Sequence, residues 1–261
     1  MFKEEEVVYV EKNGLSYMQF KRLLKYGIKH AYTFKGEGVD FSFNQDKNKT
    51  SYEALCNALE IDFNNVVQPV QTHTDIIKCI DKIESTESLQ DVDGLITDKK
   101  NIALTTKNAD CILFLFYDPV KKVIANVHSG WRGTFQKIAE KAAIKMINYY
   151  GCKAEDILCF ICPSIRKCHF EVETDVKELC EEIFKFTNRT EEFIEVGEII
   201  DGEQKYNIDT VLINKILLTE LGIKEKNIID CNICSVCNKD KVESVRVDGS
   251  DAGRATAIIM L

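Results

Sequence analysis

Long apolar runs and an excess of basic residues are both missing from this chain of 261 residues. No apolar stretch approaches the roughly 20 residues that span a bilayer, so we expect no membrane partner. The chain carries 34 basic against 42 acidic side chains, a formal charge of −8, and its basic residues are scattered. We therefore expect no nucleic-acid partner either, although a local pocket for a small anion is compatible with this charge.

An export signal and a proline-rich linker are also missing. The N-terminus, Met1–Glu6, lacks the apolar core of a signal peptide, which predicts a cytoplasmic protein. The eleven cysteines are then expected to be free thiols, since a reducing compartment disfavours disulfides. Only three prolines and no low-complexity segment interrupt the chain, so we predict a single domain over residues 1–261.

Short apolar runs and helical patterns alternate along the chain. We predict strands over 94–97, 102–106, 112–117, 123–127, 242–247 and 255–261. Helical spacing predicts helices over 135–150, 175–186 and 209–222, and the stretch 14–26 also has a helical pattern. Because the central strands lack clean alternation, both faces of their sheet should be covered. These features predict an α/β (α+β) layered sandwich with mixed β-sheets covered by helices.

Two histidines and one cysteine stand at the ends of predicted strands. They are His73, Cys111 and His128. Two imidazoles and a thiolate suit Zn²⁺, and three ligands leave the open position that is typical of catalytic sites. The alternatives are a buried cysteine with two ordinary surface histidines, or a nucleophilic thiolate with an imidazole base. Asp110 either orients an imidazole from outside the ligand set or is a solvated turn residue.

Two further patterns are weaker indications of a functional site. Cys-x-x-Cys spacings occur at Cys159/Cys162 and along Cys231, Cys234 and Cys237, as in zinc ribbons and iron–sulfur sites. We expect packed or incidental thiols rather than a cluster, since at Cys159/Cys162 a three-residue step within an apolar strand turns the side chains to opposite faces.

Glycines beside basic residues form the second of these patterns. They lie at 35–38, 131–133, 246–249 and 253–254, where backbone amides and a guanidinium can hold an oxyanion. None of these segments matches a P-loop or a dinucleotide fingerprint.

Five blocks of sequence resemble the laccase-domain family, also called the polyphenol oxidase or peptidoglycan editing factor family. The blocks are Gln71–His73, Asn108–Cys111, His128–Gly133, Cys162–Val172 and Ser244–Arg254. The segment from His30 to Asn44 is similar to the N-terminal motif of that family, so the resemblance extends from about His30 to the C-terminus. It implies a single α/β layered domain and a purine nucleoside phosphorylase.

The resemblance also implies a site and a reaction. Zinc would be held by His73, Cys111 and His128. The reaction would be phosphorolysis of adenosine, inosine and S-methyl-5′-thioadenosine to the base and ribose 1-phosphate, with adenosine deamination as a second activity. A zinc-activated water suits that deamination.

The other site residues expected from this resemblance are one acid and four polar side chains. Asp110 is expected to be catalytic, and the predicted contacts to substrate or phosphate are Lys35, Asn44, Arg132 and Arg246. Lys35 stands where the family generally has arginine, so a planar donor is replaced by a point charge.

Three alternatives remain open. A copper-dependent polyphenol oxidase would need a two-histidine, one-cysteine copper site and a further cluster with more imidazoles, whereas the chain has four histidines in all. A Cys-His hydrolase that edits peptidoglycan would use Cys111 as its nucleophile. A metal-binding protein without catalytic activity would hold zinc and turn over neither substrate.

Overall fold

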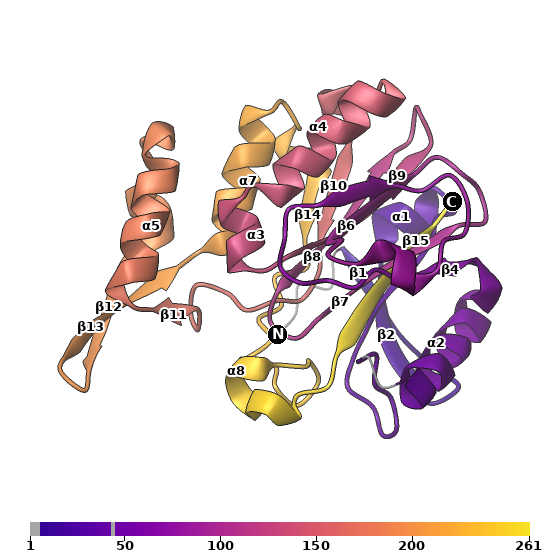
Figure 1. The fold of residues 1–261 in the computed structure, drawn as a ribbon, viewed down its shortest axis with the longest axis horizontal. Helices are drawn as coiled ribbons and strands as arrows, with labels where there is room; N and C mark the ends of the chain where they lie inside the picture. Colours follow the sequence, from indigo (N-terminus) through magenta and orange to yellow (C-terminus); the bar gives the residue numbers. More distant parts are fainter. Residues whose placement is uncertain (1–5, 43–44) are drawn as a thin grey trace.

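Two six-stranded sheets pack face to face at the centre of the protein (Figure 1). The computed structural model describes residues 6–42 and 45–261, with no side-chain description for 45–47. The first sheet has the strand order β1 (Val7–Lys12), β2 (Leu15–Phe20), β3 (Lys29–Thr33), β15 (Ala255–Met260), β7 (Ala103–Asn108) and β4 (Val66–Val67). The second has the order β14 (Ile228–Asp230), β10 (Leu158–Ile161), β8 (Ile112–Asp118), β9 (Val123–Ser129), β6 (Gly94–Thr97) and β5 (Ile77–Cys79).

The largest apolar cluster lies between these sheets. Leu104 and Ile259 of the first sheet pack there with Leu115 and Phe160 of the second, and all four are fully buried. Every residue of β8 is buried, because helices cover the other face of its sheet. This explains why the central apolar runs lack the alternation of a half-exposed strand.

Helices form the two outer layers. The helix α2 (Gln45–Leu59) packs on the first sheet, while α4 (Ile138–Tyr150) and α7 (Thr210–Glu220) pack on the second. Gly151 ends α4 in the left-handed conformation, with φ of 67°, and the side chain of Asp209 caps α7 by accepting a hydrogen bond from the Leu212 amide. The prediction of mixed sheets covered by helices is confirmed.

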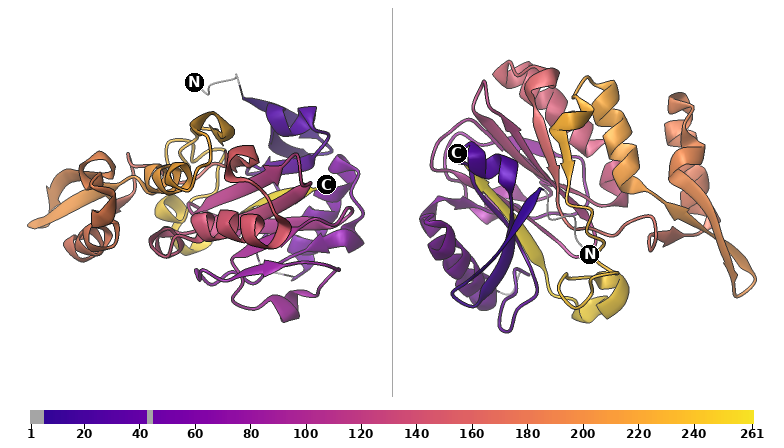
Figure 2. Two further views of the ribbon diagram at one scale, coloured as in Figure 1. Left: turned by 90° about the horizontal axis from the view of Figure 1, so that it is seen from above. Right: turned by 180° about the vertical axis from the view of Figure 1, so that it is seen from behind.

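A smaller lobe projects from one end of the sandwich, and Figure 2 shows it clear of the sheets in both views. Its parts are β11 (Glu171–Val172), β12 (Ile194–Ile200), β13 (Glu203–Ile208), α5 (Thr174–Phe184) and α6 (Thr190–Phe193). Phe184 and Phe193 fill its core against Ile208 and Phe135. Within the ranges that the structure describes, no helix is both long enough and apolar enough to cross a membrane.

Two predicted elements are wrong. The stretch 14–26 begins with the strand β2 and only then forms the short helix α1 (Lys21–Lys25), because Asn13 and Gly14 form a tight β1–β2 turn with φ of 55° and 77°. The predicted strand 242–247 instead ends in the helix α8 (Val245–Asp248).

Candidate functional site

The three predicted metal ligands converge at one end of the second sheet. Cys111 lies between β7 and β8, and His128 lies on β9, where it is paired in register with Leu113. His73 reaches them from the loop after β4, with Nε2 lying 3.7 Å from Cys111 Sγ. The ligand atoms of all three lie within 4.8 Å of one another. Since a tetrahedral zinc separates its sulfur and nitrogen ligands by about 3.6 Å, this group fits a metal ion.

Gly130 lets the chain pass close to these ligands. A Cβ atom at this position would lie 2.7 Å from His73 Cδ2 and 3.1 Å from Cys111 Sγ. Both separations are below ordinary contact distance, so any other residue would displace the ligands. Gly130 is therefore required because there is no room for a side chain. Its backbone conformation does not require glycine, since its φ of −68° is open to any residue.

A buried aspartate, Asp93, holds both histidines in place. Its Oδ1 accepts a hydrogen bond of 2.7 Å from His128 Nδ1 and one of 3.1 Å from the His73 amide. Its Oδ2 accepts bonds from the Thr74 amide and hydroxyl at 2.9 Å and 2.8 Å. The bond at Nδ1 leaves Nε2 of His128 as the ligand atom. Asp93 was not identified from the sequence, where Asp93-Gly94 has only the appearance of a turn.

Charge on this network favours the metal-binding form of Cys111. Burial raises the pKa of the Cys111 thiol, but the charge and hydrogen bond of His128 and the hydrogen bond from His73 outweigh it and lower that pKa to about 6. Burial lowers the pKa of His128, but the Cys111 charge and the Asp93 hydrogen bond outweigh this and raise it to about 9. Without a metal, the two shifts therefore favour a Cys111 thiolate paired with a protonated His128 at neutral pH. The thiolate is the form that binds metals, and binding through His128 would release its proton.

We expect Asp93→Asn to weaken metal binding at this site by about 10- to 100-fold, the usual cost of losing a carboxylate behind a histidine ligand. Competition with a chromophoric chelator measures this affinity. Asp91→Asn is a matched control, because Asp91 bonds the Thr72 hydroxyl and neither histidine. Equal affinity in the two variants would mean that Asp93 does not orient His128.

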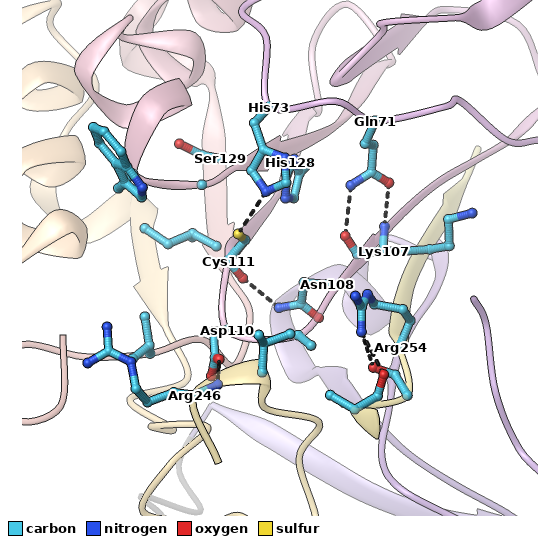
Figure 3. Close-up of a pocket in the computed structure, with 18 of the residues that line it drawn as sticks. Gln71, His73, Lys107, Asn108, Asp110, Cys111, His128, Ser129, Arg246 and Arg254 are labelled. Carbon is cyan, nitrogen blue, oxygen red and sulfur yellow. Dashed lines mark hydrogen bonds between the residues drawn. The ribbon is translucent and has the colours of Figure 1, made fainter. Parts of the chain in front are cut away.

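An open cavity of about 1030 Å³ adjoins the three ligands (Figure 3). Two cations line it on one side: Lys107, from β7, and Arg254, just before β15. Lys107 is buried, and its pKa is lowered to about 8 by burial and by the charge of Arg254, against the opposing charge of Asp40. The side-chain amide of Gln71 bonds the Lys107 backbone at both the carbonyl and the amide, each at 2.7 Å.

Apolar side chains form the other part of the cavity wall. They are Ile112, Trp131, Ile165, Phe170 and Val245. Trp131 packs edge-on against Phe135, with ring centroids 5.3 Å apart, which anchors it to the lobe core. A cavity with cations on one side and aromatic surface on the other can take a ligand that is part anionic and part flat and apolar.

The structure separates the predicted anion contacts. Arg246 lines the cavity, and its guanidinium donates hydrogen bonds to the carbonyls of His169 and Glu171. Lys35 forms an ion pair with Asp248 at 2.7 Å and does not line the cavity. Asn44 lies outside the described residues.

Arg132 is the fourth predicted anion contact. It is exposed, lies 4.2 Å above the Trp131 ring, and is also absent from the cavity wall. These positions argue against direct substrate contact by Lys35 and Arg132.

Asp110 does not orient an imidazole, which corrects one of its two predicted roles. Its Oδ1 accepts bonds from the hydroxyls of Ser235 and Ser244, at 2.5 Å and 2.7 Å, and its Oδ2 accepts one from the Arg246 amide at 2.7 Å. Asp110 therefore ties the loop that carries Cys111 to two later segments of the chain. It also lines the cavity, so its predicted catalytic role stays a prediction.

Comparison with known proteins places this geometry in a family. A purine nucleoside phosphorylase of Clostridium acetobutylicum is 32% identical over 225 residues, which cover 85% of this chain and 87% of that protein. A purine nucleoside phosphorylase of Staphylococcus aureus is 28% identical over 259 residues, which cover 92% and 94%.

Solved structures share the fold. The hypothetical protein YfiH of Bacillus licheniformis superimposes with a TM-score of 0.86 at 22% identity, covering 97% of this chain and 98% of that one. The family model described as "Multi-copper polyphenol oxidoreductase laccase" matches residues 36–261. The chain belongs to this laccase-like family, some of whose members are named purine nucleoside phosphorylases.

Proposed function

We propose that this protein is a zinc-dependent purine nucleoside phosphorylase. It would cleave adenosine, inosine and S-methyl-5′-thioadenosine with phosphate, giving the free base and ribose 1-phosphate. The observation that carries the proposal is that the three metal-ligand side chains line the same cavity as the cations Lys107, Arg246 and Arg254. The names of the relatives from Clostridium acetobutylicum and Staphylococcus aureus support it.

Each part of the cavity suits one part of the reactants. Lys107 and Arg254 would hold phosphate through charge-assisted hydrogen bonds. Trp131 and Phe170 would enclose the purine, whose ring is flat and largely apolar on its faces. Holding both reactants in one cavity lowers the entropic cost of bringing them together.

We propose that His73, Cys111 and His128 hold the metal, because two imidazoles and a thiolate match zinc in type and spacing. When bound, zinc would supply a Lewis acid at the wall of the cavity. This chemistry also suits adenosine deamination, which we propose as a second activity.

The histidines argue against the copper alternative. His30 is fully buried and its two ring nitrogens face the Phe20 amide and the Ile28 carbonyl. His169 faces three cysteines and does not line the cavity. Two imidazoles remain beside Cys111, fewer than a multicopper cluster needs.

The test is chromatography of adenosine incubated with zinc-loaded protein, with and without phosphate, following adenine, inosine and hypoxanthine together. We expect adenine to appear only with phosphate. Inosine alone would leave deamination without phosphorolysis, and unchanged adenosine in both samples would refute the proposed function.

A Cys-His hydrolase is a second candidate, because the low pKa of Cys111 beside two imidazoles also suits a nucleophile. This alternative predicts that iodoacetamide alkylates Cys111 equally fast with and without added zinc. The phosphorylase proposal predicts protection by zinc, since a bound thiolate is a poor nucleophile.

A further inference from the structure

A second group of metal-ligand side chains lies outside the cavity. Cys168 and His169 stand in the turn after β10, and Cys234 and Cys237 in the segment after β14. None of the four lines the cavity. Cys234 is buried, whereas Cys168 and Cys237 are exposed. The cysteine spacing in the second segment was expected to mean packed thiols, but two of its thiols instead meet a cysteine and a histidine from about 65 residues earlier.

The spacing of these four side chains matches a tetrahedral zinc site. Cys168 Sγ lies 3.6 Å from Cys234 Sγ and 3.8 Å from Cys237 Sγ. His169 Nδ1 lies 3.1, 3.7 and 3.5 Å from the sulfurs of Cys168, Cys234 and Cys237. Zn–S bonds of about 2.3 Å and a Zn–N bond of about 2.05 Å would place two sulfurs about 3.8 Å apart and a sulfur and nitrogen about 3.6 Å apart. Both sulfur–sulfur distances, and the distances from His169 Nδ1 to Cys234 and Cys237, lie within about 0.2 Å of this geometry, whereas the distance from Nδ1 to Cys168 is shorter.

Disulfide pairing does not explain the arrangement. A disulfide requires sulfurs about 2.05 Å apart, and these cysteines are free thiols. One sulfur, Cys168, is instead nearly equidistant from two others, as around a shared ion.

Backbone hydrogen bonds fix the two segments against each other. The Ser235 amide donates to the Ser164 carbonyl at 3.0 Å, and the Ser164 amide donates to the Ile233 carbonyl at 3.2 Å. Within the second segment, the Asn238 amide donates to the Cys234 carbonyl at 3.1 Å. The Cys-x-x-Cys turn is therefore held in shape beside the Cys168 turn by bonds that do not involve the thiols. A preformed ligand set lowers the ordering cost of binding an ion.

We propose that Cys168, His169, Cys234 and Cys237 bind a second Zn²⁺, distinct from the metal at the cavity. Four protein ligands complete the tetrahedron and leave no open position, which makes this a structural site. The bound ion links the turn after β10 to the segment after β14.

Both segments that the ion links also contact residues of the cavity wall. The His169 carbonyl accepts a bond from Arg246 at 3.1 Å, and Ser235 bonds Asp110, the neighbour of Cys111. Loss of the second zinc would therefore loosen Arg246 and the Asp110 loop without removing any ligand at the cavity.

The test is the zinc content of the full chain, measured by mass spectrometry after exhaustive dialysis under reducing conditions. We expect about two zinc ions per chain for the natural sequence, and about one both for Cys168→Ser/Cys237→Ser and for His73→Ala/Cys111→Ser. The first double substitution changes two exposed side chains, so the variant should fold. A natural chain with about one zinc ion, which disappears in His73→Ala/Cys111→Ser, would overturn the proposal.

Two further measurements separate ligation from packing. His169→Cys keeps a four-ligand set and should retain both zinc ions, whereas His169→Ala should bind the second ion at least about tenfold more weakly. The variant His73→Ala/Cys111→Ser keeps only the second site, so after loading with cobalt it should still show thiolate-to-cobalt charge-transfer absorption. That absorption should vanish in the fourfold variant that also carries Cys168→Ser/Cys237→Ser. Absence of that absorption in the first variant would contradict the second site. These readouts do not depend on phosphorylase activity.

Discussion

Cys111→Ser and His128→Ala should each lower kcat/KM for phosphorolysis by about a thousandfold, because a metal acting as a Lewis acid supplies several kcal/mol. Each removes one of three ligands whose atoms lie within 4.8 Å of one another. Steady-state release of adenine from adenosine measures the effect. Zinc content should fall by about one ion per chain in parallel, since the Cys168 group is unaffected.

Cys79→Ser is the matched control for these ligand variants. Cys79 is also a partly buried free cysteine at the second sheet, but it belongs to neither ligand group. It should retain both zinc content and activity. A Cys111→Ser protein that loses zinc yet keeps full phosphorolysis would show that the metal is not part of the reaction.

Lys107→Met and Arg254→Met should each raise the KM for phosphate by about 10- to 100-fold, because a hydrogen bond to a charged group contributes about 1.5–3 kcal/mol. Lys107 is buried and its pKa is lowered in part by the charge of Arg254, so phosphate would meet two neighbouring cations. Methionine replaces lysine at similar length and removes both the charge and its hydrogen-bond donors. The measurement is initial rate against phosphate concentration at saturating adenosine.

Lys35→Met and Arg132→Met serve as the controls for phosphate binding. Lys35 is neutralised by Asp248, and Arg132 lies on the outer side of Trp131, so neither faces the cavity. We expect their KM for phosphate to change by less than about threefold. A large effect in these variants, with none at Lys107 and Arg254, would place the anion site elsewhere.

The sequence was sufficient to identify the proposed metal ligands as candidates, but it did not show that they lie close together. Histidine and cysteine are rare residue types, and their position at predicted strand ends singled out His73, Cys111 and His128 as candidate ligands. Their proximity depends on the β8–β9 register, which pairs Leu113 with His128. Asp93 could not be recognised, because its role depends on β6 lying beside β9.

The cations Lys107 and Arg254, which line the cavity, were not among the phosphate contacts predicted from the sequence, for a related reason. A basic residue beside glycine is typical of anion-binding loops, and on this pattern Lys35 and Arg132 were predicted to contact phosphate. Lys107 has no such neighbour and directly follows the predicted strand 102–106, where a lysine looks like an exposed residue at a strand end. The second sheet and the helices cover both faces of this region, so its side chain is buried instead.

Most of the fold was readable from local patterns. The strand 94–97 was predicted with its observed bounds, and the helices over Asp175–Phe186 and from Asp209 lie within a few residues of α5 and α7. The β1–β2 hairpin was missed although Asn13-Gly14 is a strong turn signal. The Cys168 group was missed because its two halves are far apart in sequence and meet only through the β10–β14 pairing.

The most direct test of the central claim is the stoichiometry of ribose 1-phosphate to adenine, followed by phosphorus NMR and chromatography on the same sample. Metal-depleted protein, reloaded protein and Lys107→Met protein should be compared at equal phosphate. We expect equal amounts of the two products from reloaded protein, almost none after metal depletion, and slow formation in Lys107→Met. Adenine released without ribose 1-phosphate, or at the same rate from metal-depleted protein, would contradict it.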